Sequence, residues 1–207
     1  MFFYYIHMNK NNKSGIYAKA LYTSEIDRYD PKTNNIINKL SDGCIYIPNF
    51  FCKKNDRTIF NSLQSEIDRI SEVQLVEWSK HHKFENPDFS ETFNKIVDEM
   101  AKHFNVEVSQ TRLNFYKDNS DWKPLHHDRH AYEGKKEDFT MGASFGYSRE
   151  LEFLHVESGK KFKFPQNNGD VFAFDTEINK IFMHGVPKTS KKVGPRFSII
   201  AWGTRFF

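Results

Sequence analysis

Two stretches in the first half of the chain have apolar residues at helical spacing. In residues 53–71 the apolar side chains recur every three or four positions, and this period predicts one amphipathic helix. The second stretch begins after Ser90, a residue type that often caps the start of a helix, and ends at Phe104. The two apolar faces are formed by Ile59, Phe60, Leu63, Ile67 and Ile70, and by Phe93, Ile96, Val97, Met100 and Phe104.

From residue 111 onward the pattern changes to short apolar runs that are separated by Gly, Pro, Asn and Lys. These runs are TRLNFY, TMGASFGYS, LEFLHV, KFKF, GDVFAF, KIFMH and RFSIIAW, and an earlier run, CIYIPNF, begins at Cys44. Short strands with turn residues between them favour an antiparallel sandwich or jelly roll. Because the helices come first and most strands follow, we expect an α+β fold in which two N-terminal helices flank a jelly-roll core.

Residues 1–43 are polar and rich in Asn, Lys, Asp and Ser, with few regular apolar positions. We interpret them as an N-terminal arm or extension without regular structure, which ends at the turn-like Ser41-Asp42-Gly43. A chain of 207 residues suits one hydrophobic core. The expected organisation is therefore an arm at 1–43 and a single domain at 44–207.

Charge and cysteine content bear on the possible binding partners and the cellular compartment. The net charge of +3 and the pI of about 8.7 allow nucleic-acid binding without requiring it. The two cysteines, Cys44 and Cys52, do not form a CxxC motif, which argues against a disulfide framework and for a reducing compartment. No apolar stretch approaches the ~20 residues of a membrane span. The N-terminal apolar run is too short for a signal peptide, so we expect an intracellular (cytoplasmic or nuclear) protein without a membrane partner.

The stretch PLHHDRHAY, residues 124–132, contains three histidines and an aspartate within five positions. Alternate side chains of an extended chain share a face, so His126, Asp128 and His130 would point one way. His127 and Arg129 would point the other way. Three alternate residues spread over ~13 Å, which makes His130 a poor third ligand for the same ion. Because an H-x-D pair also arises by chance in a chain with nine histidines, a metal site here needs a further ligand from elsewhere.

A third ligand is available 58 residues later. His184 lies in FMHGVP, and Arg196 follows 12 residues after it at the start of RFSIIAW. Two histidines and one carboxylate with open coordination positions are typical of non-haem Fe(II) oxygenases. An arginine close after the second histidine suits a bidentate contact with a carboxylate. The order of these residues favours chemistry that uses Fe(II) and 2-oxoglutarate.

At this point the chain resembles the AlkB family of 2-oxoglutarate-dependent dioxygenases over residues 44–203. LNFYKDNSDWKPLHHD resembles the family's block of N-x-Y, loop and H-x-D. FTMGASFGYSRELEF and NNGDVFAF are similar to the strands that follow, and FMHGVPK and GPRFSIIAW match the segments with the second histidine and the arginine. CIYIPNFF and the helix after it resemble the family's first strand and helix.

The resemblance implies a double-stranded β-helix core and a set of site residues. The implied iron ligands are His126, Asp128 and His184. For 2-oxoglutarate it suggests Tyr116 and Arg196 at the far carboxylate, Asn114 near the metal end, and Ser198, which shares a strand face with Arg196. The implied cosubstrates are 2-oxoglutarate and O2, which yield succinate, CO2 and an oxidised C–H bond. Oxidation of an N-methyl group releases formaldehyde, and the net result is demethylation.

Three departures from the family pattern bear on the cosubstrate and the substrate. Trp202 stands where repair members often carry a second arginine. In the loop between Tyr116 and His126, Asn119 replaces a usual glycine, and the loop is one residue longer than is usual in the family. Arg129 and His130 occupy the region where an acidic residue often contacts the methylated base. We nevertheless expect a nucleic-acid base as substrate, because of the family, the mild basicity and the tract KTSKKVGPR. Candidate substrate-side residues are His130, Arg129, Trp122 and Tyr132, although Trp122 and Tyr132 serve equally well as core aromatics.

Other functions remain as alternatives. The same chemistry also suits a protein or small-molecule hydroxylase or demethylase, and a non-catalytic jelly-roll binding module would keep the fold alone. GASFG, residues 142–146, fits the G-x-S-x-G nucleophile elbow, with Asp175 and His184 following in triad order. That elbow needs a helix after it, whereas SRELEFLHV alternates like a strand. A serine hydrolase is therefore the remote alternative, and we expect Ser144 on a jelly-roll strand.

Overall fold

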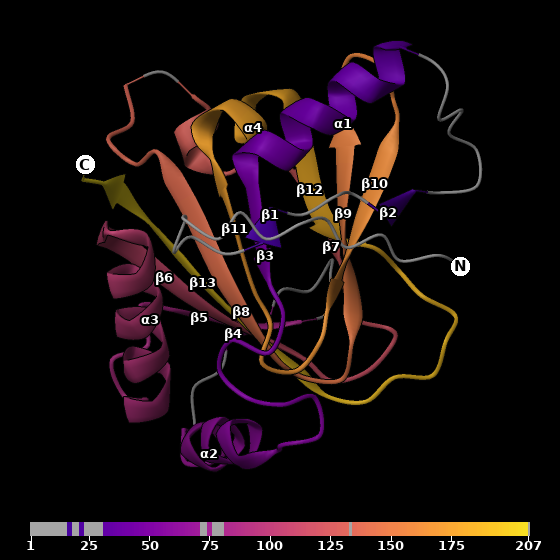
Figure 1. Ribbon diagram of the computed structural model, residues 1–207. Coiled ribbons are helices and arrows are strands. Elements are labelled where there is room, and N and C mark those ends of the chain that lie inside the picture. The colour runs from indigo at the N-terminus through magenta and orange to yellow at the C-terminus, as the bar shows by residue number, and fades with distance from the viewer. Residues whose placement is uncertain are drawn as a thin grey trace.

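The computed structural model describes residues 16–17, 21–22, 31–70, 74–75, 81–132 and 134–206 (Figure 1). Both helices expected from the apolar period are present. They are α2 (Thr58–Ile67) and α3 (Glu91–Phe104). Ser90 caps α3, where its Oγ accepts a hydrogen bond of 3.0 Å from the amide of Phe93.

Residues 31–43 differ from the expectation of irregular structure, because they form helix α1 (Pro31–Gly43). Its buried side chains are Ile36, Ile37 and Leu40. A helix that is mostly polar can be stable when one apolar stripe packs against strands, because tertiary packing supplies most helical stability. The other residues before 31, apart from 16–17 and 21–22, lie outside the described residues, so the interpretation of residues 1–30 as an arm stays a prediction.

A fourth helix, α4 (Thr176–Ile181), interrupts the run that was predicted as the strand KIFMH. The Asp175 carboxylate accepts a hydrogen bond of 3.0 Å from the amide of Ile178 and caps this helix. Lys180 and Ile181 belong to α4, and the strand begins at Phe182. A helix of six residues is too short to show an apolar period in the sequence.

The strands form two antiparallel sheets (Figure 1). The eight-stranded sheet has the order β1-β3-β11-β8-β13-β6-β5-β4, and the five-stranded sheet has the order β2-β10-β9-β12-β7. The strand bounds are β1 Ile16–Tyr17, β2 Leu21–Tyr22, β3 Cys44–Ile47, β4 Gln74–Leu75, β5 His82–Glu85, β6 Val106–Tyr116, β7 Lys123–His126, β8 Phe139–Gly146, β9 Arg149–His155, β10 Lys161–Gln166, β11 Val171–Asp175, β12 Phe182–Val186 and β13 Arg196–Arg205.

The eight-stranded sheet has a different environment on each face. On β13, Phe197, Ile199 and Ala201 join a hydrophobic cluster with residues of α2 and α3, which cover this face (Figure 1). Ile200 and Trp202 belong to a second cluster, which lies between the sheets and reaches α1. Strand alternation therefore directs every second side chain of β13 into the space between the two sheets, as in the expected jelly roll. The α+β jelly-roll prediction is confirmed.

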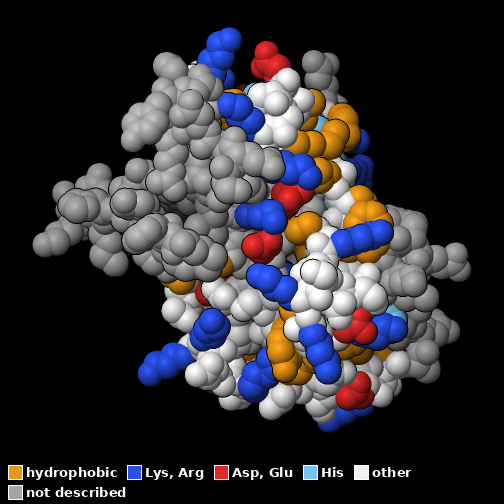
Figure 2. All heavy atoms as spheres, turned by 90° about the vertical axis from the view of Figure 1, so that its right-hand side faces the viewer, with side chains coloured by type: hydrophobic (Ala, Val, Ile, Leu, Met, Phe, Trp, Pro, Cys, Tyr) orange, Lys and Arg blue, Asp and Glu red, His pale blue; other side chains and the backbone are white. Residues whose placement is uncertain are grey.

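The side of the molecule on which β10 lies carries mixed charge. Figure 2 shows lysine and arginine side chains interspersed with acidic ones across this face. Two cross-strand ion pairs contribute to the pattern, Lys161 with Glu152 and Lys163 with Glu150, at 3.1 and 2.9 Å. Among the helices that the structure describes, none has the length and apolar character needed to cross a bilayer.

Candidate metal centre and cosubstrate pocket

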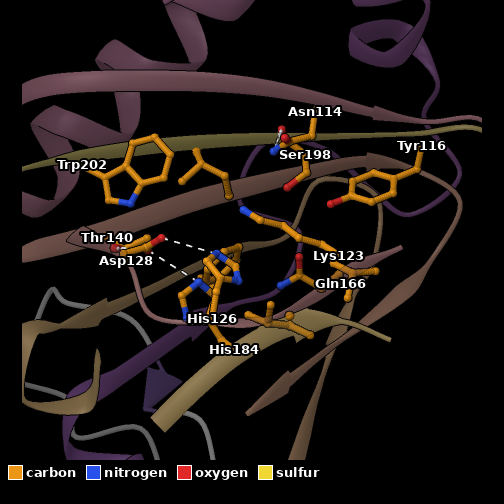
Figure 3. A pocket seen from close by; sticks show the side chains of 15 residues that line it. Asn114, Tyr116, Lys123, His126, Asp128, Thr140, Gln166, His184, Ser198 and Trp202 are labelled. Carbon is orange, nitrogen blue, oxygen red and sulfur yellow. Dashed lines mark hydrogen bonds and ion pairs between the residues drawn. The ribbon is translucent and has the colours of Figure 1, made fainter. Parts of the chain in front are cut away.

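Two histidines and one aspartate converge between the sheets (Figure 3). β7 and β12 pair so that His126 lies directly opposite His184, and their ring centroids are 4.4 Å apart. Asp128 follows β7 by two residues, and its carboxylate oxygens lie 3.6 Å from Nε2 of each histidine. One ligand atom from each of the three residues lies within 4.8 Å of the others, which is compact enough to hold one metal ion.

The hydrogen bonds of His126 leave one nitrogen free for a metal. Its Nδ1 lies 2.9 Å from the carbonyl oxygen of Pro124, and because a carbonyl can only accept, Nδ1 carries the proton. Nε2 therefore presents a lone pair, and it is buried without a hydrogen-bond partner. A buried, unpartnered nitrogen is unfavourable in a folded protein, and a bound metal would satisfy it. The donor set, two imidazoles and a carboxylate, suits Fe(II).

Asp128 is held through both its side chain and its backbone. The Thr140 hydroxyl donates to the carboxylate Oδ2 at 2.8 Å. Asn179 of α4 accepts from the Asp128 amide at 2.9 Å and donates to the Asp128 carbonyl at 3.0 Å. These contacts fix the direction of the carboxylate. Neither Thr140 nor Asn179 was identified from the sequence, because hydrogen bonds between distant polar residues leave no pattern in it.

His130 supports the same carboxylate from further away. It is buried, and its ring nitrogens lie 2.7 Å from the Thr140 hydroxyl and 2.9 Å from the Thr176 hydroxyl. Since Thr140 donates its proton to Asp128, it accepts from His130. The chain after Asp128 turns into a short 3₁₀ helix, Arg129–Ala131, so the alternation assumed for an extended chain does not continue to His130.

The charge states of the triad favour metal binding. Burial would raise the pKa of the Asp128 carboxyl, but nearby His184, His126 and Lys123 outweigh it and hold the pKa well below its usual range. Burial also lowers the pKa of His184 well below its usual range, despite the opposing effect of Asp128. At neutral pH the carboxylate is charged and His184 is neutral, and these are the forms that coordinate a metal.

A pocket beside the triad contains three of the four expected cosubstrate residues. Asn114, Tyr116 and Ser198 line it, together with the triad. The Asn114 side-chain amide donates to the Ser198 carbonyl at 3.5 Å, and its Oδ1 is buried without a partner. The ring of His81 stacks on that of Tyr116, with centroids 5.0 Å apart. Among the residues that line the pocket, Asn114 thus offers a polar atom, Oδ1, without a partner in the protein.

Arg196, the fourth expected residue, does not line this pocket but contacts two residues that do, Gln166 and Tyr116. Its guanidinium is fully buried, donates to Ser144 Oγ at 3.0 and 2.6 Å, and donates to Gln166 Oε1 at 2.7 Å. Its Nη1 is buried without a partner, and Tyr116 lies beside it, 5.2 Å from Cζ to the ring centroid. Burial lowers the pKa of Arg196 to about 10, so it remains protonated at neutral pH. A buried cation of this kind is suited to an anionic ligand.

The serine-hydrolase alternative has no structural basis here. Ser144 lies within β8, and a short turn leads from β8 directly into β9 of the other sheet, so no helix follows it. Its hydroxyl accepts from Arg196, and the Asp175 carboxylate caps α4. As expected, Ser144 is a jelly-roll residue next to the site.

A second pocket adjoins the triad and shares part of its lining with the first. His126 and Asp128 line both pockets, and so does Trp202, the residue in the place of the expected second arginine. Of the four candidate substrate-side residues, Arg129 and His130 line this second pocket. Trp122 and Tyr132 line neither pocket. The other residues that line the second pocket are Gln110, Arg112, His127 and Glu137.

Trp122, Tyr132 and His127 have other surroundings. The Lys188 ammonium lies 4.6 Å from the centre of the Trp122 ring. Tyr132 is 59% exposed, and its ring meets that of His127 at a centroid distance of 6.4 Å. His127 contacts the backbone carbonyl of Asn179 and takes no part in the metal-ligand group, in agreement with the expected alternation.

Comparison with known proteins identifies the family. A family model of the 2OG-Fe(II) oxygenase superfamily matches residues 71–204. The chain belongs to this superfamily. Its cofactors are accordingly Fe(II), 2-oxoglutarate and O2, and the protein is a dioxygenase. The expected resemblance to AlkB-like dioxygenases is confirmed at the level of superfamily and fold.

Two solved structures share the fold at low sequence identity. A prolyl-4-hydroxylase from Pseudomonas putida superposes with a TM-score of 0.58 at 14% identity, covering 80% of this chain and 94% of that one. OsALKBH1 superposes with a TM-score of 0.50 at 15% identity, covering 77% and 97% of the two chains. A search among curated protein sequences gives no significant match.

Proposed function

We propose that this dioxygenase oxidises a nucleic-acid base, most specifically by removing an N-methyl group. His126, Asp128 and His184 would hold the iron, and 2-oxoglutarate would extend from the metal toward Tyr116 and Arg196. The observation that carries the proposal is that His126 and Asp128 line two pockets. One of them includes Tyr116 and Gln166, which contact the buried Arg196, and the other includes Arg129, His130 and Glu137. Fe(II) with 2-oxoglutarate supplies the oxidising power when bound.

The protein's own residues position the reactants. Thr140 and Asn179 orient Asp128, and the Pro124 carbonyl fixes the tautomer of His126. Arg196 offers the free Nη1 to the far carboxylate of the cosubstrate, and the apolar core around the sheets limits access of water. An N-methyl carbon would enter from the second pocket, which two of the residues that would hold the iron, His126 and Asp128, also line. The hydroxylated methyl group then leaves as formaldehyde.

The lining of the second pocket supports a base as the substrate. Gln110, His127 and Glu137 offer donors and acceptors of the kind that read a base edge, and Trp202 supplies an aromatic wall. Arg129 brings positive charge to the same lining for contact with phosphates, whereas Arg112 is paired with Glu85 at 2.8 Å. A base reaches this pocket only when it is unpaired or flipped out of a duplex.

The metal and cosubstrate parts of the proposal are tested with purified protein under anaerobic conditions. Addition of Fe(II) and 2-oxoglutarate should give the weak visible charge-transfer band of the chelate. His184→Ala should abolish it, whereas His103→Ala, a histidine of α3 outside both pockets, should keep it. A native protein without the band at saturating cosubstrate would refute the assignment of the triad.

The substrate part requires turnover. Succinate and formaldehyde should form together when methylated single-stranded oligonucleotides are supplied, and binding should weaken with salt. Matched unmethylated oligonucleotides should give no formaldehyde. Succinate formation that is stimulated by peptides or small molecules, and not by any oligonucleotide, would replace the nucleic-acid proposal with the hydroxylase alternative.

A further inference from the structure

The pairing of β7 with β12 contains an irregularity next to the metal site. His126 lies opposite His184, while Lys123 lies opposite Val186, so two steps along β12 correspond to three along β7. In a regular strand, residues three apart point to opposite faces. The extra residue in β7 is a β-bulge, and it turns Lys123 to the same side as His126.

The local sequence fits this bulge. Pro124 lies inside it, where a residue without an amide proton removes no ladder hydrogen bond. On the facing strand stands Gly185, at which a Cβ atom would lie 2.7 Å from the carbonyl oxygens of both Lys123 and Pro124. The two backbones can approach this closely only because the residue at 185 is a glycine.

As a result of the bulge, Lys123 enters the cosubstrate pocket. Its side chain extends from β7 between the triad and Ser198 (Figure 3). Among the described residues that line the pocket, Lys123 is the one lysine or arginine. It makes no hydrogen bond or ion pair with any residue that the structure describes.

With a metal ion bound, the site around Lys123 would carry more positive than negative charge, which favours an anionic ligand. Burial lowers the pKa of the Lys123 ammonium to about 8, and the negative charge of Asp128 is the largest effect that opposes this shift. A divalent ion, Lys123 and Arg196 together outweigh the single negative charge of Asp128. A dianion that spans the pocket would offset most of this excess.

From this geometry we infer that Lys123 binds the metal-end carboxylate of 2-oxoglutarate. The inference rests on the proposed cosubstrate site. On β13, the uncharged indole of Trp202 stands where repair members of the family often carry a second arginine. The inference is that Lys123 of β7 supplies the positive charge instead. Arg196 serves the far carboxylate at the other end, so each end of the dianion meets its own cation.

The test measures binding rather than turnover. Zn(II)-loaded protein is titrated calorimetrically with 2-oxoglutarate and with 2-oxobutyrate, a 2-oxo acid that lacks the far carboxylate. Lys123→Met should weaken both ligands by a similar factor, about 10- to 100-fold, as expected for loss of a charged hydrogen bond. Arg196→Met should weaken 2-oxoglutarate alone. Lys123→Arg should retain most of the affinity, and Lys102→Met, an exposed lysine of α3, should behave as wild type.

The outcomes separate this inference from the proposed function. Wild-type protein that fails to bind 2-oxoglutarate would refute the cosubstrate site itself. Wild-type binding with Lys123→Met within about twofold of it would overturn the role of Lys123 alone. A loss in Lys123→Met that spares 2-oxobutyrate would place Lys123 at the far carboxylate and overturn the metal-end assignment. If Lys123→Met does not fold, Lys123→Gln, which keeps a polar side chain of similar length, is judged by the same criteria.

Discussion

Lys123 should make cosubstrate binding sensitive to alkaline pH. Because its pKa is lowered to about 8, the ammonium is charged below that pH and neutral above it. The negative charges of Asp128 and Glu85 raise this pKa, while Arg112 and Lys83 lower it. A carboxylate binds the charged form, so affinity for 2-oxoglutarate should fall as pH rises through about 8.

Calorimetric titrations of the Zn(II) protein between about pH 6.5 and 9.5 measure this dependence. In Lys123→Arg the alkaline fall should disappear, since an arginine stays protonated over this range. An identical fall in the arginine variant would assign the titration to another group.

Asn179 should matter for the metal although it does not touch it. In Asn179→Ala the backbone amide and carbonyl of Asp128 lose their partners, which should lower the free energy of unfolding by about 1–3 kcal/mol. Because the backbone of Asp128 is then held less firmly, Zn(II) affinity should fall by roughly 10-fold or more, although Thr140 still contacts the carboxylate. Urea unfolding and a competitive metal titration measure the two effects. Asn94→Ala, which removes an exposed hydrogen bond to Asp88, serves as the control and should change neither much.

At the level of residues, the alternation of side chains along an extended chain was the most useful guide in the sequence. Alternation grouped His126 with Asp128, and the structure places His184 within reach of both. The same rule would place Lys123 on the opposite face, because a bulge is a property of two paired strands and the partner strand is not visible in a local pattern. Asn179 was missed for a similar reason, since its partner lies 51 residues away.

Elements were predictable in proportion to their length and amphipathic character. α3 has a capped start and four buried apolar residues in register, and β13 alternates between two buried faces. β5 and β7 have four residues each, and α4 has six, so none of them repeats a period often enough to be recognised. α1 was hidden by its Asn and Lys residues, although Ile36, Ile37 and Leu40 already form a helical stripe.

The close approach of β7 and β12 gives a prediction at the scale of elements. Gly185→Ala adds a methyl group against two backbone oxygens, so β7 should shift away from β12. We expect a loss of about 1–3 kcal/mol in the free energy of unfolding, as for other overpacked sites. Zn(II) affinity should also fall, because His126 moves with β7.

Gly194→Ala is the matched control for this substitution. Its new Cβ would meet the ring of Tyr147, which is 50% exposed and can move aside. Wild-type metal affinity in Gly185→Ala would show that the spacing of these two strands does not control the site.

At the scale of the whole molecule, α1 belongs to the core that supports the site. Leu40 is fully buried in the cluster between the sheets, and Gly43 lies so close to α4 that a Cβ there would overlap Ile178. Leu40→Ala should therefore lower the free energy of unfolding by about 2–5 kcal/mol. Chemical denaturation measures it, and Lys39→Ala at the exposed neighbouring position should change little. An unaffected Leu40→Ala would mean that the fold does not depend on this helix.

The bulge in β7 also changes how other chains of this superfamily should be read. Where the position of the second arginine holds an uncharged residue, a sequence can be taken for one that has lost its cosubstrate. Here the charge comes from a different strand, at the lysine that precedes the H-x-D histidine by three positions, with a proline next to it and a glycine after the distant histidine. A search for K-P-x-H-x-D together with a later H-G would therefore recover active dioxygenases that a criterion based on the arginine alone discards.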